Sequence, residues 1–592
     1  MKKHWREWLA GGLLFFVTLA IYIQAVHFGF VQPEDEIHYF EARSRLDAGG
    51  SPVPESLRMP SSALYWVPVS NFLLFIDVFM CGDQIGLLHL INLLFHAASS
   101  LLLFLILRLA SGRIWQSLFA AALFGLHPMN TEAVVTWCWG ATLAEGLLFL
   151  ATFLAYLHYA RGPNAARYLG VIFCFVLGLL ARPSILYLPV LLLLFDFWPL
   201  GRWRPAGAHQ ESRFAVRSPG KLIWEKIPLL MIAGAWLAAA LYAIRLMPAF
   251  PGSRNISAEN YLYLFNLPVA YALFLRIMVF PVRLPSYFPD PLKTPSLLPF
   301  WQVLLAAAVL VAVCVLVVRK GRRYPFLVTG WLWFLIALFP SAVVCVAQHR
   351  IVMERLGYLP MIGMFIIVAW GGPLLLRKAG LSGKASIAAA VLIAVVLSLV
   401  SGLQARHWSD RISYFRQAVA THPDSEKAHS DLGEVLYNAG RIDEAMACFE
   451  TALRLNPDYA VAHNHLALLL NQRGERERAL AHWRRAVQAD PDYAQAHNNL
   501  ANLLADLGDM DGAVFHYQQA LQIDSALFQV HNNLATVLMA KGDFPLAVRH
   551  LEESLRINPE YKMARDNLLR VRQMMQNSRG KKDAAASPET SP

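Results

Sequence analysis

Three consecutive acidic residues, Glu34, Asp35 and Glu36, follow the first long apolar run of the chain, within the stretch FVQPEDEIHYFEAR. Carboxylates near a membrane surface can take a proton from a hydroxyl, hold a cation, or simply be solvated. The loop that carries them, residues 27–83, is long for a connection between membrane spans, and long loops are often functional. What these acids can do depends on the side of the membrane that they face.

Ionisable residues also occur near the ends of other apolar segments. Such residues are costly in a membrane and tend to line cavities. They are His127, Glu132 and Glu145. For Glu132 the alternative is helix capping. A further polar face, with His89, Asn92 and His96 at helical spacing, is more typical of hydrogen bonds between neighbouring membrane helices than of a metal or proton site.

A third polar group consists of asparagines that recur with a period of 34 residues in the C-terminal part. They are Asn464, Asn498, Asn499, Asn532, Asn533 and Asn567. Side-chain amides can pair with the backbone of an extended peptide without reading its sequence, so these residues are candidates for peptide binding. Solvated polar positions on a helix are the alternative.

The composition indicates a membrane protein. The 592 residues are 56% hydrophobic and 16% charged, and the mean hydropathy is +0.40, which is too apolar for an ordinary soluble chain. Much of the net charge of +11 comes from Lys and Arg in short loops, which indicates membrane topology rather than nucleic-acid binding. The 6 Cys residues are scattered and predict neither a zinc site nor a disulfide framework.

Eleven apolar segments predict membrane spans, the first of them retained rather than cleaved. They lie at about 9–26, 84–107, 115–127, 142–160, 168–181, 184–198, 227–247, 301–318, 325–346, 359–376 and 386–404. Residues 261–281, within an outer loop at 248–300, contain Pro and Arg and are expected to be re-entrant or interfacial. Basic loops on alternate connections then place residues 27–83 and everything after residue 404 outside the cytoplasm.

A repeat of 34 residues begins after the last span. Gly440, Gly474, Gly508 and Gly542 keep this period, as do Ala445, Ala479, Ala513 and Ala547, which is typical of tetratricopeptide repeats. Four repeats are expected between 426 and 561, with a closing helix at 562–577 and a disordered tail at 578–592. RISYFRQAVATHP reads as the second helix of a further repeat, so we expect the solenoid, residues 405–577, to be stiffly attached to the membrane domain, residues 1–404.

Several motifs then carry a family resemblance. EDEIHYFEARSRL resembles the first outer loop of membrane glycosyltransferases with the GT-C fold. HLINLLFHAASSLLLF, LHPMNTEAVVTW, LLLLFDFWPLGR with WEKIPLL, and ERLGYLPMIGMF are similar to stretches of the transmembrane and tetratricopeptide-repeat O-mannosyltransferases and their bacterial relatives. The resemblance implies an all-α fold: a GT-C-like bundle of about eleven spans followed by a repeat superhelix.

The resemblance also implies roles for individual residues. Asp35, with Glu36 beside it, would be the catalytic carboxylate, and Arg355 and Arg182 would bind the donor phosphate. Glu354 and Arg182 replace the usual Asp and Lys of the relatives. Cavity-lining candidates are His38, His127, Glu132, Glu145, Glu354 and Tyr358.

The expected function is transfer of a sugar, such as mannose, from a polyprenyl-phosphate donor to Ser or Thr hydroxyls of proteins held by the repeats, with inversion at the anomeric carbon. Alternatives are a membrane-anchored repeat scaffold for envelope complexes and a transferase with a lipid or glycan acceptor. A divalent cation is possible, and no dedicated metal site is predicted. The expected location is a bacterial inner membrane with the repeats in the periplasm. The particular sugar and acceptor are not readable from the sequence.

Overall fold

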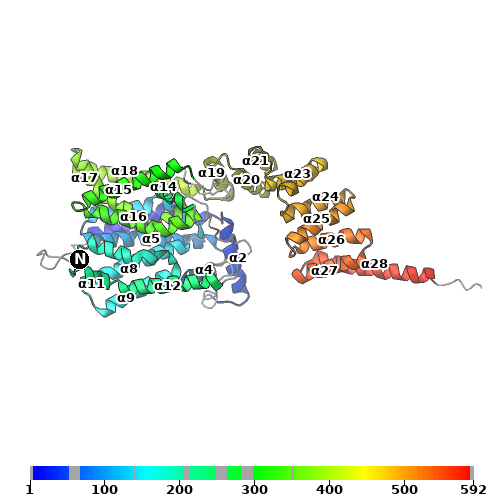
Figure 1. The fold of residues 1–592 in the computed structure, drawn as a ribbon, viewed down its shortest axis with the longest axis horizontal. Helices are drawn as coiled ribbons and strands as arrows, with labels where there is room; N and C mark the ends of the chain where they lie inside the picture. The colour runs from blue at the N-terminus through cyan, green and yellow to red at the C-terminus, as the bar shows by residue number, and fades with distance from the viewer. Residues whose placement is uncertain are drawn as a thin grey trace, which may run out of the picture. The chain divides into compact units, whose positions relative to one another are not determined.

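The computed structural model describes residues 5–51, 67–137, 140–203, 214–246, 263–281, 284, 298–347 and 353–586, apart from the side chains of Pro33, Glu34, Tyr263, Glu354 and residues 243–246, 344–347 and 578–586. The chain divides into two compact units, Met1–Thr421 and His422–Pro592 (Figure 1). The named elements are all helical. The predicted all-α class, a bundle of apolar helices followed by a repeat superhelix, is confirmed.

The first unit is a bundle of long apolar helices. Within the described residues, eight helices are long and apolar enough to cross a membrane, and nine if the bent pair Ile114–Leu126 and Pro128–Val135 forms one span. The main helices are α1 Trp5–Tyr22, α5 Ile85–Ser111, α6 Ile114–Leu126, α8 Gly140–Arg161, α9 Ala165–Ala181, α10 Leu188–Phe197, α12 Ile227–Leu246, α15 Phe300–Gly321, α16 Pro325–Ala347, α17 Met361–Lys378 and α18 Gly383–Arg406.

The count of eleven spans stays a prediction. It needs α9 and the segment Pro183–Phe197 as spans, and both are shorter than the eight long helices. The segment expected to be interfacial contains α14, Leu267–Val279, of 13 residues. A helix of about 20 Å is too short to cross the roughly 30 Å hydrocarbon core of a bilayer without help.

Two helices occupy the expected acidic loop. α2, Pro33–Asp47, begins with Pro at its first turn, where the missing N–H of Pro costs nothing. α4, Pro68–Cys81, follows. Tyr39 of α2 and Phe75 of α4 share a buried cluster with Trp137, which holds the two helices against the bundle.

Several contacts place α2 at one end of the bundle. Near the end of α1, the Gln24 amide donates to Gly402 O of α18 at 2.9 Å, and Ser401 Oγ of α18 donates to Leu126 O at the end of α6 at 2.7 Å. α19, Arg411–Thr421, begins just beyond α18, and Arg411 Nη2 lies 2.6 Å from Glu36 Oε2 of α2. The ends of α1, α6 and α18 therefore lie at the same end of this unit as α2.

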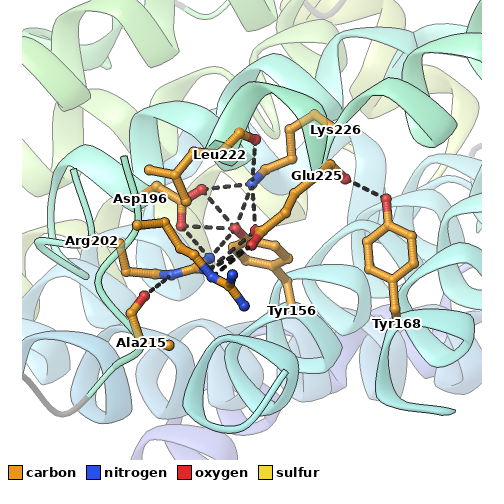
Figure 2. A network of polar contacts seen from close by, with 9 residues as sticks. Tyr156, Tyr168, Asp196, Arg202, Ala215, Leu222, Glu225 and Lys226 are labelled. Atoms are coloured by element: carbon orange, nitrogen blue, oxygen red, sulfur yellow. Dashed lines mark hydrogen bonds and ion pairs between the residues drawn. The ribbon is translucent and has the colours of Figure 1, made fainter. Parts of the chain in front are cut away.

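A buried network of charges (Figure 2) lies near α11, Pro219–Trp224, at the end of the bundle away from α2 (Figure 1). Asp196 at the end of α10 lies 2.9 Å from Arg202 Nη1 and 2.7 Å from Lys226 Nζ. Tyr156 of α8 donates to Asp196 Oδ2 at 2.6 Å, and Arg202 Nη2 lies 3.2 Å from Glu225. Because Asp196, Arg202 and Lys226 have no exposed surface, mutual pairing compensates for their desolvation.

The second unit is a regular series of helix pairs. They are α20 Glu426–Asn438, α21 Ile442–Leu455, α22 Ala460–Gln472, α23 Arg476–Ala489, α24 Ala494–Asp506, α25 Met510–Ile523, α26 Phe528–Lys541 and α27 Phe544–Ile557. The glycines of the 34-residue pattern all have positive φ, between 74° and 88°, because the chain turns there in a conformation that favours Gly. The matching alanines are fully buried, where neighbouring helices pack closely.

The flanks of the repeats are also helical. α19 precedes them, and its Phe415 and Ala418 are buried, at the positions of Phe449 and Ala452 one period later. α28, Lys562–Ala586, follows them and extends past residue 577, where we expected the disordered tail to begin. Residues 587–592 lie outside the described part of the chain.

Candidate functional site

α2 presents one polar face to a cavity. His38, Glu41, Ala42 and Arg45 lie at i, i+3, i+4 and i+7 on this helix and line the same cavity, as the helical period dictates. Arg45 and Glu41 are 2.5 Å apart. Asp35 lies one turn before His38, is 1% exposed, and is not among the residues that line this cavity.

This cavity, which we call the α2 cavity, has a volume of about 210 Å³. Its remaining walls come from α4, from Phe95 of α5, from Trp137 and the start of α8, and from the end of α9, and their polar residues include Asn71, Asp77 and Arg182. Ser70 Oγ of α4 donates to Ala181 O at 2.5 Å, which ties α4 to the residue beside Arg182. The α2 cavity therefore combines charged, amide and aromatic groups.

Asp77 is the perturbed acid of the α2 cavity. Burial raises its pKa to about 7, and the hydrogen bond from the Trp137 side chain opposes this shift. A half-buried carboxyl group with this pKa can accept or donate a hydrogen bond near neutral pH. Asp77 is thus suited to bind a polar, uncharged group.

A second cavity, which we call the arginine cavity, has a volume of about 250 Å³ and is lined by Glu145, Arg182, Ser341, Arg355 and Tyr358, among others. It contains both arginines that were predicted to bind phosphate. Their side chains are 19% and 10% exposed, Arg182 and Arg355 respectively. Arg182 lines both cavities.

Acidic partners hold the two arginines in place. Arg355 Nη1 donates to the Glu132 carboxylate, and its backbone N–H donates to Glu132 Oε2 at 3.3 Å. Arg182 donates to Thr142 Oγ1 and lies 4.0 Å from Glu145 Oε2. A guanidinium held in a fixed orientation beside a cavity is a typical partner of an oxyanion such as phosphate.

Tyr358 is fixed through a buried histidine. The Tyr358 hydroxyl lies 2.9 Å from His96 Nδ1, and His96 Nε2 lies 3.1 Å from Gly125 O. Asn92, on the same helix face as His96, donates to Thr136 O at 3.0 Å. For Asn92 and His96, these contacts support the interpretation that polar residues of this face bond neighbouring segments.

The other predicted cavity residues have different surroundings. Glu36 is paired with Arg411. His127 lies 3.0 Å from Met278 O and accepts from Met129 N at 3.2 Å, so it joins two segments of the bundle outside the two cavities. Glu132 supports Arg355 rather than capping a helix. Glu354 lies beside Arg355 in the chain, but its side chain is outside the described part.

The asparagines of the repeats bond one another between successive units. Asn499 Nδ2 donates to Asn464 Oδ1 at 2.9 Å, and the pairs 498–533 and 532–567 repeat this contact at 3.3 and 2.9 Å. Asn464 and Asn532 are buried, and their amides join neighbouring repeats. Asn498, Asn499, Asn533 and Asn567 are only partly buried and remain the candidates for peptide binding.

Sequence reasoning missed most of the α2 cavity. Glu41, Arg45, Asn71 and Asp77 were not predicted as site residues because residues 27–83 were treated as a loop. Pro33 at a helix start and the spacing of His38, Glu41 and Arg45 were the available signals. Nothing in the sequence indicated that Asp77, on an apolar helix, would lie across from α2. Within the described residues, no three His, Cys, Asp or Glu side chains gather closely enough to hold a metal ion.

Fold and site together define a class: an integral membrane protein with a repeat solenoid and two polar cavities joined by an arginine. Models of the tetratricopeptide repeat match residues 404–469, 494–526 and 529–553, and a TPR repeat model matches 468–508. The C-terminal unit is therefore a tetratricopeptide-repeat solenoid.

The chain is similar to protein O-mannosyl-transferases. Protein O-mannosyl-transferase Tmtc3 of Drosophila melanogaster is 22% identical over 424 residues, which cover 60% of this chain and 45% of that protein. Protein O-mannosyl-transferase TMTC4 of Homo sapiens is 24% identical over 399 residues, 60% of this chain and 52% of that protein. The predicted resemblance is confirmed, and the chain spans about half the length of these curated relatives.

The chain is also similar to solved structures of TPR proteins. A thermophilic TPR protein of Thermus thermophilus is 21% identical, and the match covers 30% of this chain and 94% of that chain with a TM-score of 0.24. YrrB, a TPR protein with an unusual peptide-binding site, is 21% identical over 26% of this chain and 79% of that chain, with a TM-score of 0.23.

Proposed function

We propose that this protein is a membrane glycosyltransferase that moves a sugar from a polyprenyl-phosphate donor to Ser or Thr hydroxyls of proteins. The observation that carries the proposal is the arginine cavity, in which two guanidinium groups face a volume of about 250 Å³ in a bundle of membrane helices. The similarity to proteins named O-mannosyl-transferases supports the same activity.

The two arginines stabilise the leaving group in this proposal. When the bond between the anomeric carbon and the phosphate oxygen breaks, the electron pair stays on the lipid phosphate, which gains negative charge. Arg182 and Arg355, held by Glu145 and Glu132, already line the cavity where this charge would develop. Preorganised cations at the site of developing charge lower the barrier because they need no reorganisation during the reaction.

Asp35 is the proposed general base. The acceptor hydroxyl loses its proton to this carboxylate while its oxygen forms the new bond to the anomeric carbon, and direct displacement inverts that centre. Asp35 lies on the helix that lines the α2 cavity, one turn before His38. The resemblance of the first outer loop assigns the base role to Asp35, and we assign a positioning role to Glu36, which is paired with Arg411.

The repeats are proposed to hold the acceptor protein. The partly buried asparagines, Asn498, Asn499, Asn533 and Asn567, offer amide groups for a peptide backbone. The contact between Arg411 and Glu36 supports a common side of the membrane for α2 and for the chain that enters the repeats. We propose that this side is the periplasm of a bacterium.

Asp35→Asn tests the activity. Mass spectrometry of envelope proteins from cells with the native chain should show hexose on Ser or Thr, and Asp35→Asn should remove it while acceptor proteins still bind. Asp47→Asn is a matched control, because Asp47 lies on the exposed side of α2 and pairs with Arg43 at 3.1 Å. Unchanged protein glycosylation in the Asp35→Asn strain would overturn the assignment and favour a scaffold.

Reporter fusions test the location. A reporter joined after residue 586 and another inserted near residue 51 should both be active outside the cytoplasm. A repeat domain in the cytosol with α2 outside would contradict the proposal, because the acceptor and the base would then be separated by the membrane.

A further inference from the structure

The lining of the α2 cavity suits a polyhydroxylated ring. It offers hydrogen-bonding groups from His38, Asn71 and Asp77, and it also includes the aromatic rings of Phe95 and Trp137. An amide and a carboxyl group can each bond two adjacent hydroxyls. An aromatic wall covers the apolar C–H face of a sugar, and such a mixture of apolar surface and a few placed polar groups is typical of ligand sites.

The charges that line the two cavities differ. In the arginine cavity two guanidinium groups accompany one lining carboxylate, Glu145, and a second carboxylate, Glu132, pairs with Arg355 from behind the lining. In the α2 cavity two cations and two acidic side chains balance each other: Arg45, Arg182, Glu41 and Asp77. Two neighbouring guanidinium groups are typical partners of an oxyanion, whereas a lining of mixed amide, carboxyl and aromatic groups suits a neutral ligand.

Arg182 connects the two environments, because it lines both. A phosphate bound between Arg182 and Arg355 has one ester oxygen on its lipid and another on its sugar. With the phosphate in the arginine cavity, the sugar can extend past Arg182 toward α2. Asp35 lies on α2, one turn before the first residue of this helix that lines the cavity, so a sugar in the α2 cavity would lie beside the helix that carries the proposed base.

We propose that the α2 cavity is the subsite for the monosaccharide of the lipid-linked donor, with Asp77 and Asn71 binding its hydroxyls and Trp137 covering its apolar face. This inference rests on the proposed function and assigns the sugar-recognising residues of that site. Asp77 and Asn71 are then specificity-determining residues, whereas Arg182 and Arg355 bind the part that all such donors share.

The test compares two lipids on the full chain in nanodiscs: polyprenyl phosphate without a sugar and polyprenyl-phosphate mannose. Asp77→Asn should weaken binding of the mannose-bearing lipid about tenfold or more, the usual loss for one hydrogen bond to a charged group, and should leave the bare lipid within about twofold. Arg355→Gln should weaken both lipids. Asp47→Asn should change neither.

The outcomes separate the two proposals. If the native chain binds neither lipid, the proposed function fails and this inference falls with it. If it binds both lipids equally well, or if Asp77→Asn weakens both to the same extent, the sugar subsite is wrong while the phosphate site stands. Asn71→Ala provides a second variant should Asp77→Asn not fold. It should likewise lower the affinity for polyprenyl-phosphate mannose relative to the affinity for bare polyprenyl phosphate.

Discussion

Replacing Asn464 with Ala tests whether the asparagine column holds the repeats together. Asn464 is 1% exposed. Its Oδ1 accepts from Trp483 Nε1 at 3.0 Å and from Asn499 Nδ2 at 2.9 Å, and its Nδ2 donates to Tyr493 OH at 3.3 Å. Asn499 and Tyr493 are partly exposed and can turn to water, whereas the buried Trp483 N–H loses its acceptor.

The expected loss follows from these contacts. A buried donor left without a partner costs about 1–3 kcal/mol, and the space left by the amide adds about 1 kcal/mol. Local opening of α22 and α23 should therefore become more favourable by about 2–4 kcal/mol, which speeds hydrogen exchange there by roughly two orders of magnitude. Mass spectrometry of exchange in the full chain measures this difference.

Two further variants make the test specific. Asn498→Ala is the matched control, because Asn498 is only partly buried and shares weaker contacts of 3.3 Å, so it should cost less than about 1 kcal/mol. In a Trp483→Phe background no indole N–H remains, and Asn464→Ala should cost about 1–2 kcal/mol less than in the native chain. The reasoning would be refuted if Asn464→Ala lowered the free energy of local opening equally in both backgrounds, or if it left hydrogen exchange in the native background unchanged.

Three other outcomes are expected. The histidine pairs 463–482, 497–516 and 531–550 have Nδ1 atoms 2.8–3.0 Å apart, and burial and the partner histidine lower the pKa of His482, His516 and His550 to about 4. Because unfolded His titrates near pH 6.5, the repeats should be most stable above that pH and lose stability as pH falls from 6.5 toward 4. When the three histidines are replaced with Gln, the free energy of local unfolding obtained from hydrogen exchange should vary less with pH across this window. Lys226→Met leaves the buried Asp196 carboxylate without one of its cationic partners and should lower the free energy of unfolding by about 3–5 kcal/mol. In thermal melts in detergent, the double variant Asp196→Asn/Lys226→Met should lose less stability than the sum of the two single variants. Gly474→Ala, at φ +81°, should lower the free energy of local unfolding of α22 and α23 by about 1–2 kcal/mol, as measured by hydrogen exchange. Gly234→Ala is the control: this residue lies on α12 with open space beside it, and the substitution should not lower the melting temperature.

The repeats could be read from the sequence because their constraints are local. Positive φ at Gly474 and close packing at Ala479 each need a particular residue type, and a period of 34 shows that the same need recurs. Long apolar helices such as α5 were predictable for a related reason, since hydropathy over some 20 residues is decided by the residues themselves.

The site depended on contacts that no local pattern encodes. Arg182 and Arg355 were predicted to act together, and they do line one cavity. Asp77 of α4, however, lines the same cavity as α2 only because α2 and α4 pack against each other through Tyr39 and Phe75. Likewise LLLLFDFWPLGR and WEKIPLL were recognised as motifs, but the mutual neutralisation of Asp196, Arg202 and Lys226 becomes visible only when α8, α10 and α11 (Pro219–Trp224) meet.

The start of α2 at Pro33 makes this helix sensitive to its register. Each residue advances an α-helix by about 100°, so deleting one residue between Asp35 and His38 would rotate Asp35 by that angle relative to Glu41 and Arg45. Deleting one residue from Gly49–Ser51, beyond the end of the helix, would leave that angle unchanged. A one-residue deletion between Asp35 and His38 should therefore abolish activity, whereas a one-residue deletion within 49–51 should preserve it.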